Sequence, residues 1–355
     1  MTEKHVITLL PFEKQFTCGE DETILAAALR QGINLRYGCK HGGCGSCKAL
    51  IADGEVDQAE ASTFALMDFE REQGMALLCS SYPLSDITIE LTDYEESELE
   101  AGAPIGRFLT EVCAIEYLTH DICELKLRLI EPARISFKAG QYVDVLVPGT
   151  TETRSYSMAN PPSADGELEL IVKLMQGGLF SEYLRGRLKV GDRLAVEGPY
   201  GSFHLRENDR PAIFIAGGSG MAPMLSLVRD MTEKRDPRAV SFFYGARAKR
   251  DLFHLEELFG FEKLLPSFRF VPALSEPAAD DAWSGATGLI TEVVRREVPN
   301  AAGMEAYLCG PSAMIDAAVA TLRRLGVAEH DIHYDKFVTK AESRAAADKL
   351  PRHGK

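Results

Sequence analysis

The sequence predicts a multidomain protein of the α+β and α/β classes, in which a small mixed α/β unit precedes an antiparallel β-barrel and a parallel α/β domain. The chain has 355 residues, enough for two or three domains, and 45% of them are hydrophobic. The apolar pattern changes along the chain from a few strands, to short alternating strands, to strands that alternate with helices. An acidic stretch with glycine and proline, residues 93–106, follows the first pattern and predicts a linker.

The first predicted domain covers residues 1–95. Segments 7–18 and 86–94 are typical of strands. Between them, residues 24–32 predict a short helix that follows an acidic cap and ends at Gly32. These elements indicate a small mixed α/β unit.

Residues 104–208 and 209–340 form the second and third predicted domains. The alternating segments of the barrel are 110–118, 123–130, 141–147, 168–174 and 193–198. The third domain has strands at 211–218, 239–247 and 306–310 and helices at 222–234 and 312–326. Residues 341–355 are polar, and we expect a loose tail.

Composition and charge exclude several functions. The first residues lack a basic region followed by an apolar run, and no later window reaches about 18 uninterrupted apolar residues. We therefore expect a cytoplasmic protein that does not cross a membrane. Residues 1–100 hold 7 Lys and Arg against 19 Asp and Glu, so −12 of the net charge of −14 lies there. The negative electrostatic field of these residues argues against nucleic-acid binding and favours a basic or complementary protein partner.

A glycine-rich segment, which we call the cysteine loop (residues 37–47), carries three cysteines. Cys39, Cys44 and Cys47 follow C-x4-C-x2-C, and Cys79 comes 32 residues later. This spacing is typical of a plant-type [2Fe–2S] site. The loop must turn backbone N–H groups toward sulfur, and we expect its glycines to allow that. They are Gly38, Gly42, Gly43 and Gly45.

Two other uses of these cysteines are open. Structural zinc also takes four thiolates, although usually from two C-x2–4-C pairs, and Cys79 has no cysteine beside it. A thiol–disulfide pair at Cys44 and Cys47 would leave Cys39 and Cys79 unused. The isolated Cys18, Cys113 and Cys123 are expected to be buried as small hydrophobic residues.

A second motif follows a predicted barrel strand. Residues 154–157 read RSYS, and an arginine beside hydroxyl groups suits a diphosphate because its planar fork binds phosphate oxygens. Some twenty residues later, Gly177 and Gly178 allow close backbone approach, and Ser181 lies at a predicted helix start, where anions are favoured. Taken alone, RSYS is more typical of an ordinary exposed strand end.

A third motif lies in the α/β domain. Residues 217–223, GGSGMAP, follow an apolar strand and open a helix, which places helix-end amides near a pyrophosphate. Pro223 stands where the third glycine of G-x-G-x-x-G belongs, and proline suits a first helical position. Residues 308–311, LCGP, repeat this layout after a later strand. A tight turn is the alternative for each, but two such turns in one sheet predict a dinucleotide site.

In this order, the motifs resemble those of the NADH-dependent reductase components of bacterial multicomponent oxygenases, over residues 3–340. RSYS resembles that family's flavin signature, GGSGMAP its nicotinamide-dinucleotide turn, and YLCGPSAM its C-G-P-P-x-M segment, with Ser312 in place of the second proline. The stretch between Cys47 and Cys79, with ETRSYSMANPP and IHYDKF, resembles the branch that serves soluble di-iron monooxygenases of the propane, alkene, phenol and methane kind.

The resemblance implies a β-grasp ferredoxin domain, an FAD barrel and a nucleotide domain. It implies that electrons pass from NADH through FAD and a [2Fe–2S] cluster, with a potential of about −400 mV, to an oxygenase. The cluster ligands would be Cys39, Cys44, Cys47 and Cys79. The FAD residues would be Arg154, Ser155, Tyr156, Ser157, Gly177, Gly178, Ser181 and Phe337. The NADH residues would be Gly217, Gly218, Ser219, Gly220, Met221, Pro223, Arg247, Cys309, Gly310 and Pro311.

Several of these roles have plain alternatives. Ser157 and Cys309 would lie near the reacting atoms, but Cys309 also fits a buried strand end, and Phe337 fits a core position. Arg247, Lys249 and Arg250 stand where an acidic residue would hold the ribose of NADH, which by chemistry favours NADPH. The resemblance favours NADH, and we expect a monomer. A Rieske dioxygenase reductase and, in another class, a zinc-stapled nucleotide sensor are the competing functions.

Overall fold

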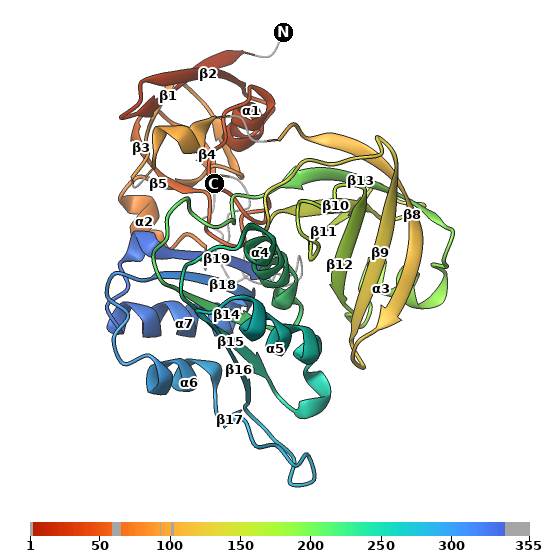
Figure 1. The fold of residues 1–355 in the computed structure, drawn as a ribbon. Helices are drawn as coiled ribbons and strands as arrows, with labels where there is room; N and C mark the ends of the chain where they lie inside the picture. Colours follow the sequence, from red (N-terminus) through yellow and green to blue (C-terminus); the bar gives the residue numbers. More distant parts are fainter. Residues whose placement is uncertain (1–2, 59–64, 93, 101–102, 338–355) are drawn as a thin grey trace. The chain divides into compact units, whose positions relative to one another are not determined.

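The computed structural model describes residues 3–58, 65–92, 94–100 and 103–337 (Figure 1). It divides into two compact units, Met1–Gly102 with Lys336–Lys355, and Ala103–Asp335. The predicted tail at 341–355 lies outside the described residues. No helix of the described ranges is long and apolar enough to cross a membrane.

The first unit contains a mixed five-stranded sheet in the order β2-β1-β7-β3-β5. Its strands are β1 (Lys4–Leu10), β2 (Lys14–Gly19), β3 (Lys48–Asp53), β5 (Met75–Leu77) and β7 (Ile87–Glu90); β4 (Val56–Gln58) pairs with β6 (Ser81–Pro83). The helices are α1 (Ile24–Arg30) and α2 (Asp68–Glu72), with a 3-10 turn η1 (Glu96–Leu99). The first and last strands, β1 and β7, run parallel at the centre, as in a β-grasp fold.

The structure of the first unit differs from two of the predictions made from the sequence. The segment 7–18, predicted as a strand, forms the hairpin β1–β2, because Pro11 interrupts it and Glu13 adopts a positive φ of 54° in the turn. The linker 93–106 is partly folded: Leu99 is fully buried, and Glu98 forms an ion pair of 2.6 Å with Arg36. Residues 94–100 therefore belong to the first unit rather than to a free connection.

The second unit begins with a six-stranded antiparallel sheet in the order β11-β10-β13-β8-β9-β12. Its strands are β8 (Gly106–Tyr117), β9 (Ile122–Glu131), β10 (Tyr142–Leu146), β11 (Thr153–Ser157), β12 (Glu167–Lys173) and β13 (Arg193–Tyr200), and α3 spans Leu179–Gly186. A bridge between Met158 and Leu170 joins the two ends, so the sheet closes into a barrel. Alternating residues of the strands fill its core.

One expected core residue of the barrel is exposed. Cys113 was expected to be buried, but it lies on the surface of β8, whereas Cys18 and Cys123 are buried as expected. The pairing of β8 with β9 shifts register between Val112 and Ala114, which is the mark of a β-bulge at Cys113.

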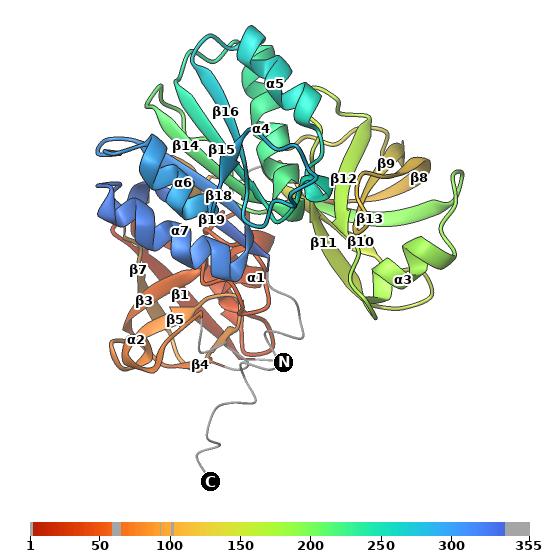
Figure 2. The same cartoon turned by 90° about the horizontal axis from the view of Figure 1, so that it is seen from below.

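The rest of the second unit is a six-stranded sheet in the order β17-β16-β15-β14-β18-β19. Its strands are β14 (Ala212–Gly217), β15 (Val240–Ala246), β16 (Phe268–Leu274), β17 (Ala286–Thr287), β18 (Glu305–Pro311) and β19 (Ile332–Phe337). Its helices are α4 (Met221–Lys234), α5 (Leu255–Leu264), α6 (Ile290–Glu297) and α7 (Ser312–Arg324), with 3-10 turns η2 (Gly218–Gly220), η3 (Lys249–Asp251) and η4 (Glu329–Asp331). Figure 2 shows α6 and α7 on one face of the sheet and α4 and α5 on the other.

The order of these strands creates a place for a ligand. The strand β14 pairs in parallel with β15 on one side and β18 on the other, so the chain first moves outward from β14 to β15 and later returns to the opposite side at β18. Dinucleotides bind at such a switch point, beyond the carboxyl ends of the strands. Both predicted glycine turns follow these ends, one after β14 and one at the end of β18.

Candidate cofactor sites

The cysteine loop turns several of its backbone N–H groups toward sulfur. The amide of Cys39 donates to Cys44 Sγ, that of Gly43 to Cys39 Sγ, and that of Gly42 to Cys79 Sγ, each at 3.3 Å. The left-handed backbone that makes this possible occurs at Gly42, Gly45 and Lys40, with φ of 70°, 82° and 59°. Gly38 and Gly43 were also expected to adopt this left-handed conformation, but they have no positive φ. Lys40 adopts it although the sequence did not predict this.

The four sulfur atoms come together as two pairs. A hydrogen bond from the Cys44 thiol lowers the pKa of Cys39, and one from Cys47 lowers that of Cys79. Among the described residues, only one group of three potential metal ligands has its ligand atoms within 4.8 Å of one another, and it contains no cysteine. No three of these four sulfur atoms therefore lie that close together. A single zinc ion with Zn–S bonds of about 2.3 Å would need all four sulfurs close together. Two pairs instead fit a group with two iron atoms.

The flavin motif itself forms a strand of the barrel, β11, which pairs with β10. In β11, Arg154 and Tyr156 point to one side, and the ring of Tyr156 lies 5.4 Å from that of Phe180 in α3. This contact brings RSYS to the first turn of α3. There Gly178 is the N-cap, and the Ser181 hydroxyl accepts a hydrogen bond of 3.0 Å from the Met175 amide.

Four further flavin candidates differ in their surroundings. The Ser155 hydroxyl donates to Asp144 of β10 at 2.6 Å, on the side of β11 opposite to Arg154, and Ser157 is buried. Gly177 has φ of 69°, and a side chain there would meet no atom within 4 Å. Phe337 lies half-buried at the end of β19. The sequence did not indicate Asp144, because its partner comes from a neighbouring strand.

The two nucleotide turns pack directly against each other. A Cβ at Gly220 would lie 2.2 Å from the carbonyl oxygen of Cys309, and one at Gly310 would lie 3.0 Å from that of Gly217. Only glycine fits such backbone contacts. Helix α4 begins at Met221, so Pro223 is its third residue rather than its first; a missing N–H still costs nothing there.

The remaining nucleotide candidates lie around these turns. Ser219 is part of η2, and Pro311 is the N-cap of α7. Cys309 is fully buried, and this burial raises the pKa of its thiol well above the usual range. It is therefore a neutral thiol.

The basic residues after β15 are partly engaged within the protein. Lys249 Nζ donates to the Asp281 carbonyl at 2.9 Å. The Arg247 carbonyl accepts from the Glu276 amide at 2.8 Å, which brings an acidic residue beside Arg247. The backbone of Glu276 thus lies beside that of Arg247, and part of the hydrogen-bonding capacity of Lys249 is used within the protein.

Family models match all three parts of the chain. A 2Fe-2S iron-sulfur cluster binding domain matches residues 7–84, an oxidoreductase FAD-binding domain matches residues 110–205, and an oxidoreductase NAD-binding domain matches residues 214–320. The protein is thus an NADH-dependent oxidoreductase that uses FAD and a [2Fe–2S] cluster.

Relatives share this whole arrangement. The reductase component of propane 2-monooxygenase from Mycolicibacterium goodii is 44% identical over 344 residues, 96% of this chain and 99% of that protein. The reductase component of phenol 2-monooxygenase from Pseudomonas sp. is 40% identical over 341 residues, 95% of each chain. The crystal structure of a cytochrome P450 reductase from Amycolatopsis has a TM-score of 0.80 and 32% identity, and the match covers 94% of this chain and 99% of that one. The chain belongs to the family of iron–sulfur flavoprotein reductases that form the reductase components of multicomponent oxygenases.

Proposed function

We propose that this protein reduces the hydroxylase component of a soluble di-iron monooxygenase with electrons from NADH. The observation that carries the proposal is the near full-length identity to propane and phenol monooxygenase reductases. The structure supports it with two pairs of cysteines, Cys39 with Cys44 and Cys47 with Cys79, which would hold a two-iron group, and with two glycine turns at one switch point. None of the eight cysteines forms a disulfide, which fits work in a reducing cytoplasm, and we propose a monomer.

In this proposal the residues hold and orient the cofactors. Arg154 and the first turn of α3 bind the FAD diphosphate, and Tyr156 packs beside the flavin. The turns at 217–220 and 309–311 bind NADH, and the four cysteines bind the cluster. Bound FAD accepts an electron pair and releases single electrons, as a [2Fe–2S] cluster requires.

An anaerobic titration with NADH tests the whole proposal. We expect the flavin absorbance to bleach first and the EPR signal of a reduced [2Fe–2S] cluster to follow. Bleaching without that signal would contradict the assignment of the cysteines. Addition of purified di-iron hydroxylase should then reoxidise the cluster, whereas reoxidation only by a Rieske dioxygenase would contradict the proposed acceptor.

The segment before Cys79 offers a surface for this acceptor. Ala65 touches the cysteine loop, because a Cβ at Gly45 would lie 3.3 Å from its carbonyl oxygen. Shortly after it, Met67 and Phe69 are 50% and 54% exposed, on either side of the acidic Asp68 of α2. Large exposed apolar side chains within an acidic field are suited to a transient protein contact.

We therefore expect Phe69→Ser to raise the KM for the hydroxylase about tenfold, the effect of losing roughly 1.4 kcal/mol at an interface. Cluster reduction by NADH should not change. Leu264→Ser is a matched control, because Leu264 is 63% exposed on α5 of the nucleotide domain. Steady-state kinetics with varied hydroxylase measure both variants. An equal KM for the two would refute this surface.

A further inference from the structure

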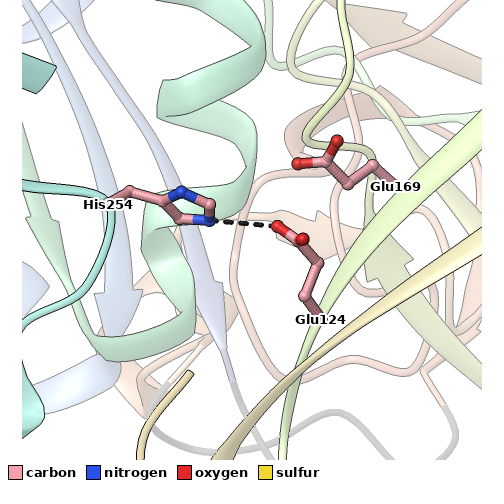
Figure 3. A group of neighbouring side chains, drawn as sticks. All are labelled: Glu124, Glu169 and His254. Carbon is pink, nitrogen blue, oxygen red and sulfur yellow. Dashed lines mark hydrogen bonds and ion pairs between the residues drawn. The ribbon is translucent and has the colours of Figure 1, made fainter. Parts of the chain in front are cut away.

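A buried pair of charged side chains joins the barrel to the nucleotide domain within Ala103–Asp335. Glu124 lies on β9, and His254 lies immediately before α5; His254 Nε2 is 3.0 Å from Glu124 Oε1 (Figure 3). The Glu124 side chain is 3% exposed and that of His254 is 15% exposed. A charge pair so far removed from water is a strong constraint, since separating it leaves a buried charge without its partner.

Arg229 of α4 makes a second link between the same domains. Its guanidinium donates to Glu169 Oε1 of β12 at 2.8 Å and to the Ala159 carbonyl at 3.0 Å. The same group forms hydrogen bonds of 2.7 and 3.0 Å with Glu257 of α5, and His254 Nδ1 lies 3.4 Å from Glu257. Glu257 thus holds both cationic side chains on the nucleotide domain, facing the barrel.

These contacts form one set, the interdomain ion network. Its members are Glu124, Lys126 and Glu169 of the barrel and Arg229, His254 and Glu257 of the nucleotide domain. Lys126 Nζ completes it at 3.3 Å from Glu124. The three glutamates carry three negative charges, and Lys126 and Arg229 carry two positive charges. Protonation of His254 adds the third positive charge and makes the network neutral.

The carboxylates and the imidazole also resemble a cation site. The ligand atoms of Glu124, Glu169 and His254 all lie within 4.8 Å of one another. However, Lys126 and Arg229 already lie against the same carboxylates, so their charge is balanced by the protein itself. The network is therefore complete without an added ion.

The network is connected to the nucleotide turn by a short rigid path. Helix α4 carries the turn 217–220 at its start and Arg229 eight residues further on, about 12 Å along the helix axis. Between them, the Ser226 hydroxyl donates to the carbonyl of Asn160 in the barrel at 2.7 Å. Strand β12, which carries Glu169, neighbours both η2 and α4. The helix that presents the nucleotide turn is thus fixed against the barrel.

We propose that the interdomain ion network sets the distance between the nucleotide turn and the flavin barrel, which makes His254 and Arg229 positioning residues for hydride transfer. The inference rests on the proposed reduction of FAD by NADH. Hydride transfer needs reacting atoms about 3–3.5 Å apart, and a displacement of about 1 Å can cost 100-fold in rate. Neither residue needs to touch a cofactor to have this effect.

The network also gives the interface a pH dependence. Burial lowers the pKa of His254, but its hydrogen bonds to Glu124 and Glu257 outweigh this and raise the pKa to about 9. The stabilisation that protonated His254 gives the folded protein is complete below about pH 6.5, the pKa of histidine in the unfolded chain. It is lost as the pH rises through about 9. We expect the rate of flavin reduction to fall over the same range.

The test compares His254→Gln with His330→Gln, a histidine of the same domain that is exposed and lies 3.7 Å from Asp331. Stopped-flow measurement should show flavin reduction at least about tenfold slower in H254Q, with little change in NADH affinity. The decrease toward pH 9 should be absent from H254Q and present in H330Q. Glu124→Gln should slow the reaction less in H254Q than in wild type, because the contact between Glu124 and His254 is already broken in H254Q.

A second readout does not depend on activity. Hydrogen exchange of the full-length protein, with and without FAD, should be faster in α4 and β12 of H254Q than of wild type, while α6 and α7 should exchange equally. Equal exchange and equal flavin reduction in H254Q and H330Q would overturn the inference. Loss of activity with EDTA and its recovery with Zn²⁺ would overturn it in favour of a metal site. If NADH does not reduce wild-type flavin, the proposed function fails instead, and the exchange data alone decide the inference.

Discussion

Cys79→Ser should leave the flavin half of the protein working and stop electron flow beyond it. Cys79 is the cysteine that comes from outside the loop, and its sulfur accepts the Gly42 amide at 3.3 Å. Without it, the pair with Cys47 is lost, and one iron would have a single protein thiolate. We expect transfer to the hydroxylase to fall by more than about 100-fold, since loss of outer partners alone costs 10–100-fold at metal sites.

The measurements for this variant are the EPR signal after reduction by NADH and the rate of hydroxylase reduction. Reduction of the flavin by NADH should match that of wild type. Cys113→Ser is the matched control, because Cys113 is an exposed cysteine of the barrel. A normal cluster signal in C79S would show that the cysteines are not assigned correctly.

Gly220→Ala should have the largest effect in the nucleotide domain. The added Cβ would lie 2.2 Å from the Cys309 carbonyl oxygen and 2.5 Å from its carbonyl carbon. Backbone atoms cannot rotate away as a side chain would, so α4 must move from β18. We expect kcat/KM for NADH to fall about 100-fold through misplacement of the turn, with a loss of roughly 1–3 kcal/mol in the free energy of unfolding.

A glycine with open space provides the comparison. Gly260 lies within α5, and a Cβ there would meet no atom within 4 Å. Gly260→Ala should keep full activity and gain roughly 0.4–1 kcal/mol in stability, since alanine restricts the unfolded chain. Urea unfolding and NADH kinetics measure both variants. Wild-type kcat/KM in G220A would contradict the described contact between the two turns.

Much of the candidate site could be predicted because its chemistry depends on residues close together in sequence. The spacing of Cys39, Cys44 and Cys47 indicated their shared use, and the glycines after β14 indicated a turn at a helix start. The antiparallel barrel and the parallel α/β sheet also follow from the change in apolar spacing.

What could not be predicted depends on contacts between distant segments. Asp144 binds Ser155 from a neighbouring strand, and His254 meets Glu124 across 130 positions of sequence. Cys113 is exposed because a bulge shifts the register of β8, which the alternation of residue types does not reveal. Lys40 takes a conformation that favours glycine, because the cysteine loop requires that turn whatever residue stands there.

The parallel pairing of β1 with β7 has a consequence for how the protein is made. Ile7 lies opposite Ile87, so the central strands of the first unit are separated by 80 residues of chain. During synthesis the cysteine loop leaves the ribosome well before Cys79 and β7, and the sheet cannot close until they follow. Iron and sulfide can therefore be enclosed only after residues 1–90 have emerged, which makes cluster insertion a step that follows translation of β7.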